Sequence, residues 1–202
     1  GLYSLSLSGK SMLTTVDFSD TSASSFMSLS GQFSGDSAIT TINMENFNVP
    51  NVTNLDTAFA GTNSLKDLNT NGMKLGKITS MNNTFAGTGY SGKLDLTELD
   101  VSNLISMSGI FSGSAISEVD MSGWQASKLE QLAGVFAGAM NLTKINMSNS
   151  DYSSVTTWDS VFTADSTSSL TEVDMSNTKF SSLASMEKVF YKFQLLQTVN
   201  LS

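Results

Sequence analysis

Seven phenylalanines recur at nearly constant spacing along this 202-residue chain, and this repeat restricts the fold more than any other feature of the sequence. The intervals between them are 26, 26, 26, 25, 26 and 28 residues. Other apolar residues keep the same interval, four and seven positions before each phenylalanine. Such a period is typical of a solenoid, in which each repeat forms one coil and buries its apolar face against its neighbours. The seven residues are Phe33, Phe59, Phe85, Phe111, Phe136, Phe162 and Phe190.

Each repeat begins with the pattern of a short strand. In residues 39–64, Ile42 and Met44 flank the polar Asn43, and this alternation predicts a strand with one buried face. The same pattern recurs in every repeat. We therefore expect the strands of successive coils to pair into one parallel sheet, with the phenylalanines stacked in a column behind it.

The second half of each repeat has helical spacing. Val52, Leu55 and Phe59 follow one another at i, i+3 and i+7, and Asn51 stands where an N-cap is expected. Gly61 lies two residues after Phe59, where a helix end favours a residue with positive φ. The sequence thus predicts a short helix on the side of each coil opposite the strand. Ala164 and Lys192 replace this glycine in the last two repeats, so we expect those two turns to differ.

The composition excludes several classes of chemistry. The chain has no Cys and no His, and all ten of its basic residues are Lys. A Ser-His-Asp triad, a Cys nucleophile and Cys- or His-ligated metal sites are therefore impossible. We expect no enzyme, and we assign no catalytic, cofactor-binding or metal-binding residue. The net charge of −8 argues against nucleic acid as a partner, and the lack of a long apolar run argues against direct membrane insertion.

Two rows of polar residues are expected on the outer face of the predicted sheet. One is an Asp or Asn in each strand, and the other is the residue two positions earlier, whose charge alternates in sign in the middle of the chain. Two interpretations remain open: the rows stabilise neighbouring coils, or they bind a partner. The candidate partner-binding residues are Asp67, Lys93, Asp95, Glu118, Asp120, Lys144, Glu172 and Asp174.

The repeat resembles a known family. The segments ITTINMENFNVPNVTNLDTAF (39–59) and LTEVDMSNTKFSSLASMEKVF (170–190) are similar to the BspA-like leucine-rich repeats of bacterial surface proteins, which read approximately L-x-x-L-D-L-S-x-F-D-T-S-x-V-T-x-M-x-x-M-F-x-x-C. The similarity extends from about Leu13 to Ser202 and departs at the family's Cys. The resemblance implies an α/β repeat solenoid: a leucine-rich-repeat-like right-handed coil of about 26 residues per repeat, with short parallel strands on one face and short helices on the other.

The resemblance also implies a function and a location. We expect a single solenoid of seven to eight rungs over residues 1–202, in which residues 1–30 form a partial or irregular first rung. We expect this solenoid to be a segment of a longer chain or to associate end to end. It would be a non-enzymatic recognition or adhesion module, extracellular or associated with the cell wall, that binds a protein or another extracellular macromolecule, such as a host surface or matrix. The alternative is a structural role, as a spacer or a self-assembling subunit of a stalk or filament. A third interpretation is that the solenoid is attached to an enzyme elsewhere in the same polypeptide.

Overall fold

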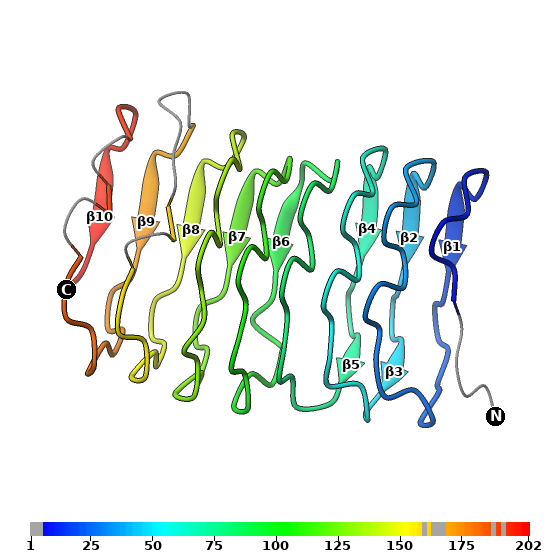
Figure 1. The fold of residues 1–202 in the computed structure, drawn as a ribbon, viewed down its shortest axis with the longest axis horizontal. Coiled ribbons are helices and arrows are strands. Elements are labelled where there is room, and N and C mark those ends of the chain that lie inside the picture. The colour runs from blue at the N-terminus through cyan, green and yellow to red at the C-terminus, as the bar shows by residue number, and fades with distance from the viewer. Residues whose placement is uncertain (1–5, 159–160, 163–168, 187–188, 191–192) are drawn as a thin grey trace.

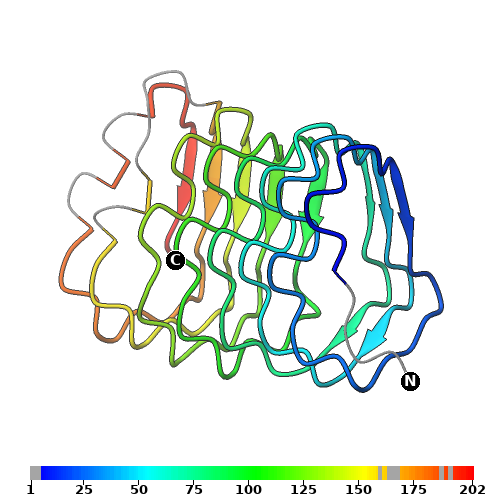
Figure 2. The same ribbon diagram turned by 45° about the vertical axis from the view of Figure 1, so that its right-hand side comes forward.

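The chain is wound into stacked coils. The computed structural model describes residues 6–158, 161–162, 169–186, 189–190 and 193–202. These residues form β-strands and turns and contain no helix, and hence no helix able to cross a membrane. Figure 1 shows the strands side by side along the long axis, and Figure 2 shows the successive coils around a common interior. The fold is therefore a parallel β-solenoid with coils of about 26 residues.

Eight three-residue strands, about one coil apart, make the main face of the solenoid. A second face carries two shorter strands, β3 (Asn48–Val49) and β5 (Lys74–Leu75), which pair in parallel. The main strands are β1 (Thr15–Asp17), β2 (Thr41–Asn43), β4 (Asp67–Asn69), β6 (Lys93–Asp95), β7 (Glu118–Asp120), β8 (Lys144–Asn146), β9 (Glu172–Asp174) and β10 (Thr198–Asn200).

The main face is divided into two sheets. Strands β1, β2 and β4 form a three-stranded parallel sheet, and strands β6 to β10 form a five-stranded parallel sheet. Within each sheet every strand pairs with the equivalent residues of the next coil, so that Val119 lies beside Ile145 and Ile145 beside Val173. Strands β4 and β6 belong to consecutive coils but do not pair, and Figure 1 shows the interruption between them.

The predicted fold class, an α/β solenoid with short helices opposite the strands, is wrong, and the backbone conformation explains why. Thr57 and Gly61 have φ angles of 54° and 70°, and an α-helix cannot pass through left-handed residues at this spacing. The chain forms a series of tight turns instead, such as the one closed by the Ala58 N–H and the Leu55 carbonyl at 3.0 Å. Four-residue turns also return every fourth side chain to the interior. The spacing of Leu55 and Phe59 therefore resembles that of a helix.

The amides between these turns bond to the next coil rather than along a helix. The N–H of Thr57 donates to the Asn82 carbonyl at 2.8 Å, and the N–H of Phe59 donates to the Thr84 carbonyl at 2.8 Å. Asn51, the predicted N-cap, donates its side-chain amide to the Ser24 carbonyl of the preceding coil at 2.6 Å. The coils are thus tied to one another along their turns as well as along their strands.

The glycines after the phenylalanines do adopt positive φ, as predicted, although they close turns rather than helices. The two turns predicted to differ, at Ala164 and Lys192, lie outside the described residues. The φ angles are 75°, 70°, 64°, 63° and 67° for Gly35, Gly61, Gly87, Gly113 and Gly138.

The predicted column of phenylalanines is confirmed. Consecutive rings from Phe33 to Phe162 are stacked with centroids 5.0–6.0 Å apart, and Phe190 continues the column in a tilted contact at 5.4 Å. All of these rings are buried except that of Phe190, which is half-buried. Each buried aromatic ring contributes roughly 1.5–3 kcal/mol of transfer free energy. Because each coil places one such ring against the ring of the next coil, the stacked rings set the spacing of the coils in the core.

Candidate functional site

The Asp and Asn residues that end the main strands all fix the turn that follows. In each of the eight strands the side-chain oxygen accepts a hydrogen bond from the backbone N–H two residues later, at 2.9–3.2 Å. This is an Asx turn, which Asp and Asn favour because their short side chains reach their own backbone. Three of the candidate binding residues, Asp95, Asp120 and Asp174, have this structural task.

These hydrogen bonds affect ionisation. Partial burial opposes ionisation of Asp120, but hydrogen bonds from the Ser122 hydroxyl and backbone amide, together with the Lys93 ammonium, outweigh it and lower the pKa of its carboxyl. At Asp100 the Ser102 hydroxyl and amide lower the pKa in the same way, assisted by the charge of Lys77. Both carboxyls are therefore ionised at neutral pH, and neither is suited to act as a general acid.

The charged row is a ladder across the five-stranded sheet. Lys93, Glu118, Lys144 and Glu172 are register partners on β6 to β9. The Lys144 Nζ lies 3.1 Å from a Glu172 carboxylate oxygen, and this hydrogen bond raises the pKa of Lys144. Lys93 pairs diagonally with Asp120, at 3.4 Å, rather than with Glu118. The alternating charges thus stabilise one another on an exposed surface.

Asp67 is not part of this ladder. The sequence predicts that Asp67 and Lys93 are neighbours on adjacent strands, but their strands, β4 and β6, are not paired. Asp67 pairs with Thr41 on the other side. The break in the sheet therefore separates Asp67 from the other seven candidate binding residues.

The break is visible in the backbone hydrogen bonds. At every other junction between main strands, the residue after the Asp or Asn donates to the carbonyl of the equivalent Asp or Asn in the next coil, as Met44 does to Asn69 at 2.7 Å. The corresponding bond from Thr70 to Asp95 is absent. In the part of the chain that the structure describes, no backbone hydrogen bond joins residues 67–75 to residues 93–100. The two coils nevertheless remain bonded on the side of the phenylalanines.

An irregular stretch of sequence accompanies the break. Ser91 is exposed and occupies a position at which the other seven coils place a buried or half-buried Leu or Ile. Tyr90 is half-buried beside it, and its ring lies over Gly92, where a Cβ atom would overlap the phenol. The Tyr90 hydroxyl donates to the Lys93 carbonyl at 3.1 Å. The apolar residues at the Ser91 position are Leu13, Ile39, Leu65, Ile116, Leu142, Leu170 and Leu196.

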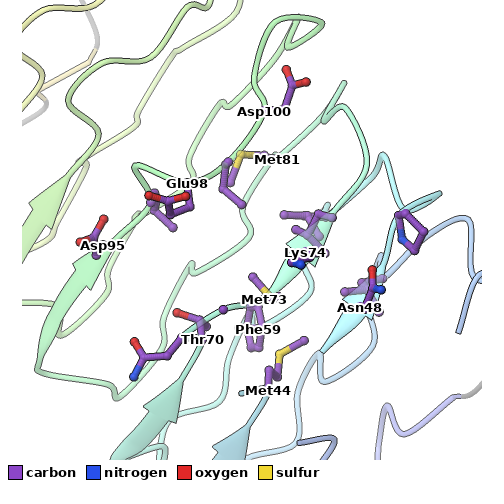
Figure 3. Close-up of a pocket in the computed structure, with 18 of the residues that line it drawn as sticks. Met44, Asn48, Phe59, Thr70, Met73, Lys74, Met81, Asp95, Glu98 and Asp100 are labelled. Carbon is purple, nitrogen blue, oxygen red and sulfur yellow. The ribbon is translucent and has the colours of Figure 1, made fainter. Parts of the chain in front are cut away.

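A pocket of about 540 Å³ lies at the break, shown in Figure 3. Its inner wall is apolar and includes side chains of the core. Its edge carries charge: Asp95, Glu98 and Asp100 from the coil of β6, and Lys74 from β5. All four charged residues are exposed. The apolar wall includes Met44, Leu55, Phe59, Met73, Leu75, Met81, Phe85, Leu96 and Leu99.

The sequence identified little of this pocket. Of its charged residues only Asp95 is a predicted binding residue, and Lys74, Glu98 and Asp100 were missed. Asp67 on β4 and Lys93 on β6 belong to the two strands that flank the break but do not line the pocket. The other five candidates, on β7 to β9, lie on the continuous sheet away from the pocket. The available signal was Ser91, the one polar residue in a column of Leu and Ile. Among the described residues, no three acidic side chains are grouped in a way that could hold a metal ion.

The fold and its faces define a class: a repeat protein of the parallel β-solenoid type, with a ladder-like strand face interrupted once. Comparison with known families agrees with the repeat, because two overlapping segments, residues 8–113 and 79–201, match one family model. The chain belongs to the family described as "Mycoplasma protein of unknown function, DUF285". No curated protein and no solved structure matches the chain.

Proposed function

We propose that this chain is a non-enzymatic recognition or adhesion module at a cell surface, and that it binds a protein or another extracellular macromolecule through its strand face. The observation that carries the proposal is the five-stranded face of β6 to β10, a continuous exposed surface with a regular charge pattern. Extended surfaces of this kind are what stacked repeats offer to large partners. The location rests on the resemblance to the BspA-like repeats of bacterial surface proteins.

The strand face has the chemistry of a polar recognition surface. Lys144 and Glu172 each expose about half of their side chain, 52% and 45%, although they form an ion pair. An exposed pair of this kind contributes only about 0.2–1 kcal/mol to stability. Its charges therefore remain available to a partner, and such charges set specificity and association rate more than stability.

The test is binding of the purified chain to immobilised extracellular-matrix proteins and to cultured host cells. The decisive variants are Lys144→Glu, which breaks the charge pattern, and the double swap Lys144→Glu with Glu172→Lys, which keeps an ion pair but inverts its direction. We expect both variants to weaken binding. The double swap keeps an ion pair, so we expect it to leave the stability of the fold unchanged. Unchanged binding by both would exclude β8 and β9 as the contact. Light scattering separates this function from the alternative, because open-ended assembly would favour a spacer or filament subunit.

A further inference from the structure

We propose that the break between β4 and β6 is a binding site for an extended segment of a partner protein, which inserts there as an additional parallel strand. The segment would place an apolar side chain towards the core and a Lys or Arg beside Asp95. The inference rests on the proposed function, since it takes the chain to be a binding module. It concerns residues apart from Lys144 and Glu172, so the two can be tested separately.

The backbone edges of β4 and β6 that face each other are open. Elsewhere on this face the sheets are continuous, but here Thr70 and Gly72 have no hydrogen-bonded acceptor for their N–H groups within the described residues. Their equivalents in the preceding coil, Met44 and Asn46, donate to the next coil at 2.7 and 2.8 Å. Open strand edges pair readily with added strands. A strand inserted between β4 and β6 would meet both edges at once.

A pocket lies behind these open edges. Its volume of about 540 Å³ lies within the usual range for ligand-binding pockets. The wall contains Met44, Met73 and Met81, whose flexible side chains adapt to ligands of different shape. Phe59 and Phe85 also line it, so that an apolar side chain entering the break would contact the aromatic column.

The charged residues that border the pocket are mostly acidic. Three carboxylates, those of Asp95, Glu98 and Asp100, border the pocket, against one ammonium group, that of Lys74. The chain as a whole has a net charge of −8. A basic residue on the inserted segment is therefore favoured over an acidic one. A peptide also fits better than a small molecule, because a peptide backbone repeats its donors and acceptors along both open edges.

The probe for this site is the peptide acetyl-Thr-Thr-Val-Lys-Met-Ser-amide with a fluorescent label, and the measurement is fluorescence anisotropy at low ionic strength. It repeats the alternation of the chain's own strands and places Lys where those strands have Asp or Asn. Two control peptides replace Lys by Glu, or carry N-methyl groups on the Val and Lys amides. N-methylation keeps the side chains but removes backbone donors.

The protein variants are matched to one another. Asp95→Asn with Glu98→Gln removes two charges from the pocket, and Asn can still form the Asx turn, as Asn69 does with the Asn71 amide at 3.1 Å. Asp174→Asn makes the same change on β9, away from the pocket. We expect the double variant to weaken binding of the Lys peptide by roughly three- to tenfold, in line with two exposed ion pairs. The Asp174 variant should leave it unchanged.

Hydrogen exchange shows where the peptide binds. We expect the Thr70 and Gly72 amides to exchange rapidly in the free chain and slowly when the peptide is bound, and the N-methylated peptide to give no such protection. The proposal is overturned by absence of binding at about 1 mM peptide, by equal binding of the N-methylated peptide, or by protection of both amides in the free chain. Protection that grows with protein concentration would instead assign the break to a second copy. Each of these results leaves the Lys144 and Glu172 test unaffected.

Discussion

The rings of Phe59 and Phe85 are stacked 5.0 Å apart with planes only 1° from parallel, and both rings line the pocket at the junction where strands β4 and β6 do not pair. One side of this junction is the most regular contact in the aromatic column, and the other side is open. The coils are therefore held together mainly by their cores and turns. The strand face is open here although the cores of the coils remain in contact.

The aromatic column should dominate the stability of the fold. Replacing the fully buried Phe111 by Ala removes a ring stacked on both sides, and we expect a loss of about 3–5 kcal/mol in the free energy of unfolding. Ile105→Ala is the control, because Ile105 is 48% exposed and its truncation should change stability by less than about 0.5 kcal/mol. Urea denaturation monitored by tryptophan fluorescence measures the free energy of unfolding of both variants. A similar loss of stability in the two would contradict a dominant role of the aromatic column.

The Asx turns should tolerate exchange of Asp and Asn but not their removal. Asn146 accepts hydrogen bonds from the Ser148 amide at 3.1 Å and from its hydroxyl at 2.8 Å. Asn146→Ala should cost about 1 kcal/mol or more, because both donors lose their acceptor. Asn146→Asp keeps an acceptor and should cost less than the Ala variant, with a small loss because its charge lies between Asp120 and Asp174. Thermal unfolding of both variants checks this, and an equal loss in the two would show that the turn does not depend on the side-chain oxygen.

Stability should fall in acid. Hydrogen bonds from neighbouring Ser residues contribute to lowering the pKa values of Asp17, Asp100, Asp120 and Asp151 below the ordinary value of an aspartate. A group with a lower pKa in the folded state stabilises the fold above its unfolded pKa of about 4, and this contribution is lost as the pH falls through the lowered value. Melting temperatures should therefore drop below about pH 4. Changing all four residues to Asn should flatten the dependence of the melting temperature on pH. An unchanged dependence would show that these four carboxyls are not the cause of the loss of stability in acid.

The break in the sheet should close when its local sequence is made regular. Tyr90→Ser with Ser91→Leu copies Ser64 and Leu65 of the preceding coil, where β4 pairs normally with β2. We expect the double variant to pair β4 with β6 and to slow exchange of the Thr70 amide. Tyr90→Phe, which removes only the bond to the Lys93 carbonyl, is the control and should leave the break open. Rapid exchange of the Thr70 amide in the double variant would show that Tyr90 and Ser91 do not cause the break between β4 and β6.

The parts of this fold that follow directly from side-chain periodicity were predictable. The Phe residues mark the coils, and the alternation around residues such as Asn43 marks the strands, because both patterns reflect burial. The helices were mispredicted because burial every fourth residue does not distinguish a helix from consecutive turns. Thr57, with φ of 54°, gives no warning by itself; the overlooked signal was Gly or Asn at its position in other coils, where the residues also have positive φ: Gly31, Asn83, Gly109 and Gly134. The pocket escaped prediction because its signal is a single missing apolar side chain at Ser91.

Strands β4 and β6 are unpaired while the rings of Phe59 and Phe85 behind them are stacked, and one nuclear Overhauser spectrum of the assigned chain tests both features. The account predicts cross-peaks between the ring protons of Phe59 and Phe85, and backbone cross-peaks between Met44 and Asn69 with none between Thr70 and Asp95. Thr70–Asp95 cross-peaks as strong as those of Met44–Asn69, or the absence of any contact between the two rings, would contradict it.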